Sequence, residues 1–337
     1  MTQLGSEAVA ILLGLLAFPL TLILTKFFMF FNSSRGIFGI DVHKKDRPKI
    51  PEMCGVSIPI TLIALSAAYG LITQGQQLKM IAFAAVVGTT CLVGAVDDLH
   101  GMRGYYKPLF GLFCGLPIVA LGLLYPNSVY NPMLQVPLFG GFHLPVIYPL
   151  TIPVAISVTS NTVNMLDPLN GVMAGGVAIL TGGLLVGLLA VGSDPLPVFL
   201  AASLLFACLG FFYFNKFPSR AFAGNVAQLS VGGAVGAFAI LGRIEIATIV
   251  AMFPHIQNSF FFLSRIKRFA EHRDITAKPT RILDDGRLAS SGNPGAPFTL
   301  VRTMLVANPL TEAKVVSRIF ALFLFSACLA AITILLS

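Results

Sequence analysis

The chain has 337 residues, of which 56% are hydrophobic and only 11% are charged, and its formal net charge is +8. Soluble domains carry about 25% charged residues, so this composition excludes a water-soluble fold and also the collagen-like, disordered and disulfide-rich classes. The length instead fits about ten membrane spans of about 20 residues plus loops. We therefore predict an all-α polytopic membrane protein, with residues 1–337 forming a single integral-membrane domain.

Apolar runs along the chain predict the membrane helices. Ten such segments lie at about 8–31, 56–73, 80–96, 108–125, 145–160, 174–192, 197–214, 227–242, 246–264 and 316–336. The first segment is interpreted as a span, because it is too long and too weakly flanked for a cleaved signal peptide. Between the fourth and fifth segments, Pro, Asn and Gly punctuate residues 126–144 and predict a small hairpin at the membrane surface.

The placement of charge indicates the topology. Alternate loops at about 32–55, 97–107, 161–173, 215–226 and 265–315 carry 18 of the 22 Lys and Arg residues, whereas the opposite loops hold only Lys79 and Arg243. Basic residues remain on the cytoplasmic side, so the first set is predicted to face the cytoplasm, with both termini outside. The +8 charge is thus interpreted as topology, with no nucleic-acid partner. Eleven of the 14 acidic residues share these loops, which predicts the active site on that face.

Two adjacent carboxylates, Asp97 and Asp98, close the third apolar segment. Carboxylates at a membrane boundary are costly unless their charge is required. A pair of them can hold Mg²⁺ or accept a proton from a nucleophile. Lys107, ten residues further on, could neutralise a diphosphate. The alternative is a solvated charge pair that ends a helix.

The run NTVNMLDPLNG, residues 161–171, follows the fifth segment and contains no Lys or Arg. The spacing of Asn161, Asn164 and Asp167 places oxygen donors roughly on one helical face, until Pro168 breaks the helix. Amide and carboxylate oxygens suit a hard cation such as Mg²⁺. Asn170 adds a fourth polar side chain to this run. Helix capping plus a turn would explain only one or two of the four residues, so we favour a functional site.

Two other loops carry weaker signals. Gly224-Asn225 precedes the eighth segment, where Asn225 is interpreted as a helix N-cap and a helix N-terminus attracts phosphate. In the first basic loop, DVHKKDRPKIPEMCG, Glu52 stands alone among cations in a proline-stiffened segment. This pattern favours hydrogen bonding to a base or a ribose, with plain positive-inside charge as the alternative.

The last loop, 265–315, is long enough to predict a function of its own. His272 and Arg273 could clamp phosphates, although a solvated basic loop fits equally well. Asp285-Gly286 between apolar pairs predicts a β-hairpin with a type I′ turn. The run FTLVRTMLVAN after Pro297 predicts a short amphipathic helix along the surface.

Taken together and in this order, these motifs resemble the polyprenyl-phosphate N-acetylhexosamine-1-phosphate transferases, of the glycosyltransferase family 4 type, over nearly the whole chain. IPEMCGV and His272-Arg273 resemble the archaeal and eukaryotic branch, the UDP-GlcNAc–dolichyl-phosphate GlcNAc-1-phosphotransferases. The resemblance implies transfer of GlcNAc-1-phosphate from UDP-GlcNAc to dolichyl or polyprenyl phosphate, with release of UMP. It also implies a Mg²⁺ cofactor, with Mn²⁺ as an option, and a first membrane step of glycan assembly such as N-glycosylation.

The resemblance assigns roles residue by residue. It implies that Asp97 and Asp98 form the catalytic acidic pair and that Lys107 contacts a phosphate. It implies that Asn164 and Asn225 occupy metal-ligand positions. The substrate-binding positions that it implies are Asp41, Glu52, Asn161, Asp167, Asn170, His272 and Arg273. Glu271 replaces the first arginine of the last-loop element. Members of the family usually have Gly-Asp where this chain has Gly224-Asn225, so one negative charge is lost and metal affinity should fall. Asp167-Pro168 stands where Asp-Gly is common, which stiffens the turn.

Other classes remain as alternatives. A polytopic transporter would also keep basic residues inside, but it would place ionisable groups near the midplane, often in inverted repeats, and neither is visible in the sequence. A bacterial-type cell-wall precursor phosphotransferase lies within the same family, whereas the repeated signature of CDP-alcohol phosphotransferases is missing. The expected location is the cell membrane of a prokaryote or the ER membrane of a eukaryote, among membrane lipids, with a homodimer as an open option.

Overall fold

The fold consists of helices joined by short loops, and the computed structural model describes residues 3–266 and 275–337. The helices before the midpoint of the chain are α1 (Gln3–Leu15), α2 (Ala17–Ser34), the 3₁₀ helix η1 (Cys54–Val56), α3 (Ser57–Ile72), α4 (Gln77–His100), α5 (Tyr106–Cys114), α6 (Leu116–Leu124) and α7 (Ile147–Met165). Those that follow are α8 (Val172–Ala190), α9 (Pro195–Asn215), α10 (Asn225–Gly242), α11 (Glu245–Ala251), α12 (Phe253–Ile266), α13 (Leu300–Met304) and α14 (Glu312–Leu335).

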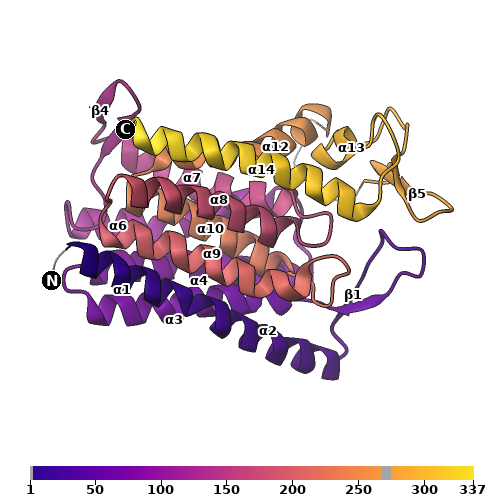
Figure 1. Ribbon diagram of the computed structural model, residues 1–337, viewed down its shortest axis with the longest axis horizontal. Coiled ribbons are helices and arrows are strands. Elements are labelled where there is room, and N and C mark those ends of the chain that lie inside the picture. Colours follow the sequence, from indigo (N-terminus) through magenta and orange to yellow (C-terminus); the bar gives the residue numbers. More distant parts are fainter. Residues whose placement is uncertain (1–2, 267–274) are drawn as a thin grey trace.

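The described loops contain three antiparallel strand pairs: β1 (Phe38–Ile40) with β2 (Lys49–Pro51), β3 (Met133–Val136) with β4 (Gly140–His143), and β5 (Thr280–Ile282) with β6 (Leu288–Ser290). The long helices run side by side, and the strand pairs project from their ends (Figure 1). β1 and β5 lie at one end of the bundle, whereas β4 lies at the other end with the start of α1 and the end of α14. Loops that are far apart in sequence thus meet beyond the first end.

The prediction of a polytopic helical membrane protein is confirmed. Within the described residues, eight helical segments are long and apolar enough to cross a membrane, or nine when α11 and α12 count as one bent span. These nine correspond to nine of the ten predicted segments. The one remaining predicted segment, at about 145–160, is α7, which is not among the qualifying spans. It is helical over 19 residues but carries several Ser, Thr and Asn residues. It packs against α5 and α10.

Prolines explain why three of the predicted spans are broken. A proline inside a helix lacks an N–H group and clashes with the carbonyl four residues earlier. Pro19, Pro117 and Pro254 each lie just after a break, between α1 and α2, α5 and α6, and α11 and α12 respectively. The axes of α11 and α12 differ by 65°.

Small residues let α10 lie at the centre of the bundle, in close contact with α4 and α7. A Cβ atom at Gly94 of α4 would lie 2.4 Å from the carbonyl oxygen of Asn225, and one at Gly232 of α10 would lie 2.5 Å from the carbonyl oxygen of Thr159. Only glycine permits such an approach. The contact at Gly94 places the next turn of α4 directly over the N-terminus of α10.

The predicted hairpins are present, with two local differences. β3–β4 confirms the hairpin at 126–144, and β5–β6 confirms the one in the last loop. In its turn only Gly286 has a positive φ (+80°), so the predicted type I′ turn, which needs two such residues, is wrong. Instead, Gly286 closes a longer loop in which the Leu283 N–H donates to the Arg287 carbonyl.

The helix predicted after Pro297 is α13, which has only five residues. Its Leu300 and Val301 are buried in a cluster with Val315 and Ile319 of α14. The helix therefore packs into the end of the bundle and does not lie free along a surface, because its two apolar residues are covered by α14. The β1–β2 pair in the first basic loop is an element that the sequence patterns did not indicate.

Candidate active site

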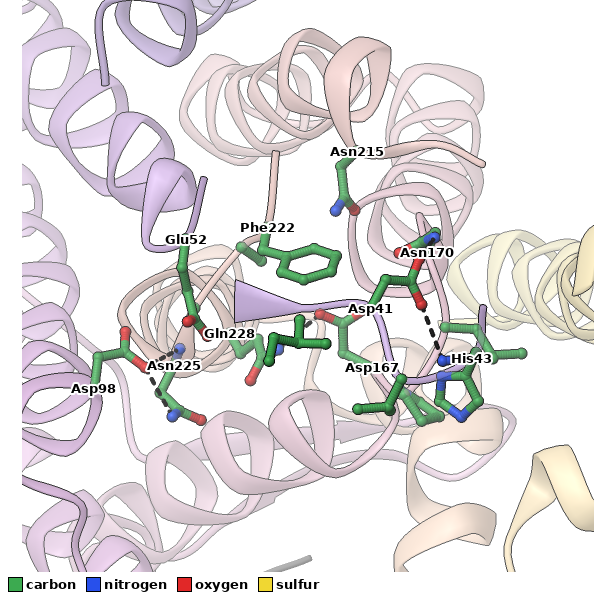
Figure 2. Close-up of a pocket in the computed structure, with 16 residues that line it drawn as sticks. Asp41, His43, Glu52, Asp98, Asp167, Asn170, Asn215, Phe222, Asn225 and Gln228 are labelled. Atoms are coloured by element: carbon green, nitrogen blue, oxygen red, sulfur yellow. Dashed lines mark hydrogen bonds between the residues drawn. The ribbon is translucent and has the colours of Figure 1, made fainter. Parts of the chain in front are cut away.

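A polar cavity of about 220 Å³ lies at the end of the bundle that carries β1 and β5. Five parts of the chain line it: the first basic loop, the end of α4, the loop between α7 and α8, the end of α9, and the segment that leads into α10 with the first turn of that helix. Figure 2 shows Asp41, Glu52, Asp98, Asp167 and Asn225 around this cavity. Together with Asn170, six of the predicted site residues, taken from four separate motifs, therefore converge on one space.

Asp98 caps the N-terminus of α10. Its Oδ1 accepts hydrogen bonds from the Asn225 backbone N–H and side-chain amide, each at 2.8 Å, and its Oδ2 accepts one from the Val226 N–H at 2.9 Å. A carboxylate here satisfies amides without helical partners and interacts favourably with the helix dipole. The interpretation of Asn225 as the N-cap is wrong: Gly224 occupies that position and Asn225 is the first helical residue.

Three side-chain amides form a network at the centre of the site. The Asn164 Nδ2 donates to Asn225 Oδ1 and to Gln228 Oε1, both at 2.5 Å. The Gln228 Nε2 in turn donates to Asp167 Oδ2 at 2.7 Å. The network joins α7, α10 and the α7–α8 loop, so the position of each amide depends on the other two.

Burial changes the acid strength of two carboxyl groups in the site loops. It raises the pKa of Asp167 to about 7, opposed by hydrogen bonds from Gln228 and the Met173 N–H. It also raises the pKa of Glu52, with a further contribution from the negative charge of Asp98. Perturbed acidic groups in a cleft are typical of functional sites.

A second polar network fixes the first basic loop. The buried Asp41 accepts a hydrogen bond from Asn170 Nδ2 at 2.9 Å, and Lys44 lies 3.3 Å from the same carboxylate. Lys44 also pairs with Glu312, which accepts a hydrogen bond from the Asn170 N–H. Asp41 and Asn170 were predicted on the substrate side, and both line the cavity. They also hold the loop against the start of α14.

Asp97 and Lys107 lie outside the lining of this cavity. The Lys107 Nζ is 2.7 Å from Asp97 Oδ2, and the two side chains are only 4% and 2% exposed. The other carboxylate oxygen of Asp97 accepts a hydrogen bond from the Met102 N–H. The pair joins the end of α4 to the start of α5. The predicted catalytic roles of both residues remain predictions.

The remaining predicted residues are placed less directly. The Asn161 Nδ2 donates to the Ser157 carbonyl within α7, and Asn161 does not line the cavity. α7 ends at Met165, so Asp167 belongs to the following loop and not to the predicted helical face. His272 and Arg273 lie outside the described residues, so their predicted role stays a prediction.

A larger cavity of about 700 Å³ adjoins the first and shares Val42, His43 and Pro168 with it. Apolar and polar side chains share its lining, which includes three cationic residues, Arg47, Lys278 and Arg281. Burial lowers the pKa of His43, which is partly opposed by the charge of Asp41. The two cavities together form one depression with an acidic, amide-rich part and a part that carries cations.

Comparison with known proteins identifies the family. The model of glycosyl transferase family 4 matches residues 80–243, from α4 to the C-terminus of α10. A Saccharolobus solfataricus protein named "Putative UDP-N-acetylglucosamine--dolichyl-phosphate N-acetylglucosaminephosphotransferase" is 30% identical over 223 residues, which cover 65% of this chain and 66% of that protein. The chain belongs to glycosyl transferase family 4. The resemblance predicted from the motifs is thereby confirmed.

Other relatives of this family 4 chain extend the similarity. A Methanocaldococcus jannaschii protein that is named as a glycosyltransferase is 27% identical over 326 residues, which cover 92% of each chain. A phospho-N-acetylmuramoyl-pentapeptide-transferase of Thermodesulfovibrio yellowstonii is 28% identical over 256 residues, which cover 65% of this chain and 68% of that protein. The matched stretch 80–243 contains the acidic pair and the whole amide network, whereas the first and last loops lie outside it.

The structure adds site residues to this family 4 chain that the sequence patterns did not select. Phe222, Asn215 and Gln228 all line the smaller cavity (Figure 2). The side chain of Asn215 is buried and its Oδ1 has no hydrogen-bond partner within the described part of the chain. A Phe in a loop and a Gln in a helix are common residues, so only their position in the lining of this cavity distinguishes them.

The chemistry of the donor set fits a hard divalent cation. Asn225 Oδ1 and Gln228 Oε1 both face the amide group of Asn164, and a half-turn of that amide would bring a third oxygen to the same point. Three converging oxygens repel one another unless a cation lies between them. All three donors are neutral, and no described group of three or more His, Cys, Asp and Glu side chains is arranged to hold a metal ion.

Proposed function

We propose that this family 4 chain transfers GlcNAc-1-phosphate, or a related N-acetylhexosamine-1-phosphate, from UDP-GlcNAc to dolichyl or polyprenyl phosphate. The name of the Saccharolobus solfataricus relative carries the same two substrates. The observation that carries the proposal is the convergence of Asp98, Asp167, Asn225 and Gln228 on one cavity at the end of a membrane bundle. A lipid substrate and a water-soluble nucleotide can meet only at such a surface.

The two cavities suggest how the nucleotide sugar lies. The Phe222 ring offers a flat face for a base, and the unpartnered Asn215 Oδ1 offers an acceptor for a base N–H. Arg47 and Arg281, in the larger cavity, provide bidentate donors for phosphate oxygens. We assign the nucleoside to the part of the smaller cavity next to Phe222 and Asn215, and the diphosphate to the part that runs from Asn225 and Gln228 toward the larger cavity.

The reaction follows from this arrangement as a single displacement. A phosphate oxygen of the lipid attacks the β-phosphorus of UDP-GlcNAc, and the bond from that phosphorus to the bridging oxygen breaks, which releases UMP. Phosphoryl transfer depends on positioning and charge neutralisation more than on covalent chemistry. The cationic side chains offset the phosphate charge, and Asp98 holds the start of α10 and Asn225 in place.

Mg²⁺ is the proposed cofactor, and Asn164, Asn225 and Gln228 are the residues that would hold it. When bound, it would neutralise charge on the diphosphate. Asp167 supports the set through its hydrogen bond from Gln228. With neutral ligands we expect weak affinity, because hard cations favour carboxylates. We place this face of the protein in the cytoplasm, following the basic loops.

A reconstitution assay tests the proposal. Purified protein with tritiated UDP-GlcNAc, Mg²⁺ and dolichyl phosphate should form a labelled lipid, and EDTA should stop its formation. The Asp98→Asn variant is the matched control, because it retains the size of the side chain and removes only the carboxylate charge. Liposomes that take up or exchange the labelled nucleotide sugar without forming the lipid would instead support the transporter alternative.

A further inference from the structure

The two basic side chains that lie at the opposite end of the bundle share one location. Lys79 and Arg243 are the only Lys and Arg residues in the loops of that side, and both line the same two adjacent cavities. Lys79 comes from the first turn of α4, whereas Arg243 directly follows α10, 164 positions later in the chain. Their convergence therefore depends on the tertiary fold.

The two cavities have volumes of about 420 and 160 Å³. The larger is lined by polar groups from several elements, among them Gln76, Gln135 and Asp194. The smaller adds Asn127 and Asn131. Within residues 3–266 and 275–337, neither Lys79 nor Arg243 forms an ion pair within 4.0 Å, and the described side-chain contact of Arg243 is with the Met133 sulfur.

Two helix N-termini add to the positive potential at this place. α4 begins after Gln76 and α9 begins after Asp194, and neither helix receives a side-chain cap from those residues. N-terminal amides and the helix dipole favour an anion. Asp194 and the terminal carboxylate of Ser337 oppose the two cations in the larger cavity, whereas the smaller cavity is lined by both cations and, among the described residues, by no acidic side chain, so its lining is net positive.

The backbone of Arg243 supports a specific role for its side chain. Its φ is +57°, in the left-handed region that non-glycine residues rarely adopt. The residue caps α10 through N–H contacts with the Ala239 and Ile240 carbonyls, a position that glycine usually occupies. Glycine would fit this backbone with less strain, and Arg243 instead places a guanidinium at this position.

We propose that this pair of cavities binds a phosphate group, held between Lys79 and Arg243. Two converging cations, one with a guanidinium fork, match a multiply charged oxyanion better than a single carboxylate. The end of the bundle lies at the level where the apolar spans stop, so the phosphate can come from a lipid headgroup or from solution. The site is separate from the candidate active site and does not depend on the proposed activity.

Binding measurements on the full-length protein in detergent test the proposal. Inorganic phosphate and dihexanoylphosphatidylglycerol serve as the two probes, and isothermal titration gives the affinity for each. Lys79→Gln and Arg243→Gly remove the charges one at a time. Arg243→Gly also relieves the left-handed backbone, so it should fold at least as well as the parent. Lys314→Gln is the matched control, because Lys314 is an exposed lysine on α14.

We expect one saturable component that weakens about tenfold or more in both cavity variants, since each loses a charge-assisted hydrogen bond, and that stays unchanged in the control. If the lipid binds and phosphate does not displace it, the source is a headgroup. If phosphate alone binds, the source is the solvent. Equal affinity in all four proteins, or no saturable binding of either probe, would overturn the proposal. Any phosphate bound at the active site would persist in the cavity variants and is thereby distinguished.

Discussion

The buried ion pair between Asp97 and Lys107 allows a quantitative test. The Nζ and Oδ2 atoms are 2.7 Å apart and both side chains are at most 4% exposed. Removal of one partner leaves the other charge buried without compensation, which costs about 3–5 kcal/mol of unfolding free energy. We therefore expect Asp97→Asn and Lys107→Met to be strongly destabilised as single variants.

The double variant should recover most of this loss. Replacement of a buried pair by uncharged side chains of similar size is often neutral, and Asn at position 97 can still accept the hydrogen bond from the Met102 N–H. We expect a coupling energy of at least about 2 kcal/mol between the two substitutions. Substitutions at independent sites, in contrast, are additive to within about 0.3–0.5 kcal/mol. Denaturant titration in detergent micelles gives the free energy of unfolding of the parent, the two single variants and the double variant. Unfolding is followed by the near-UV absorbance of tyrosine, because the chain contains no tryptophan.

Additive losses in the double variant would refute this reasoning, because they would show that the two charges do not compensate each other. The predicted catalytic roles add a separate expectation: the double variant should fold but should not transfer the phosphosugar. A stable double variant with parental turnover would remove both residues from the catalytic group and leave the pair as a structural link between α4 and α5.

Three further predictions concern the cavity itself. Asn225→Asp restores a negative metal ligand, so Mg²⁺ should raise the melting temperature at lower concentration than in the parent; an unchanged Mg²⁺ dependence would contradict the amide-ligand assignment. Gly224→Ala should lower the unfolding free energy by about 1–3 kcal/mol, since φ is +72° and the new Cβ would lie 2.7 Å from Asp98 Oδ2. Asp167 has a pKa of about 7 in the fold, above its unfolded value, so its contribution to stability is present at low pH and is lost as the pH rises from about 4 to 7. This slope, about 1 kcal/mol per pH unit, should disappear from denaturation curves of Asp167→Asn.

Much of the fold could be predicted because its signals are local. A span needs only a continuous apolar run, and the hairpin in the last loop needs only a turn dipeptide between apolar residues, although its turn type was wrong. The helix breaks next to Pro19, Pro117 and Pro254 also have a local signal, because a proline inside a helix removes a backbone N–H donor and interrupts the helix. The number of helices that qualify as spans is lower than expected because α7 is enriched in polar residues.

The site was predictable only in part, because its geometry depends on contacts between distant segments. The motif residues Asp98, Asn164 and Asn225 were selected by type and spacing. That Asp98 caps α10 across 127 positions depends on the close packing at Gly94, which no local pattern indicates. Gln228 and Phe222 lie in ordinary sequence surroundings and become site residues only through their neighbours.

The most direct test of the proposed activity follows the β-phosphate of the donor. Purified protein is incubated with dolichyl phosphate and UDP-GlcNAc that carries ³²P at the β-position, and the lipid and nucleotide products are separated. Phosphosugar transfer predicts that the label enters the lipid while UMP is released without label. Label that stays in released UDP would show transfer of the sugar alone, and would contradict the proposed reaction at the cavity lined by Asp98, Asp167 and Asn225.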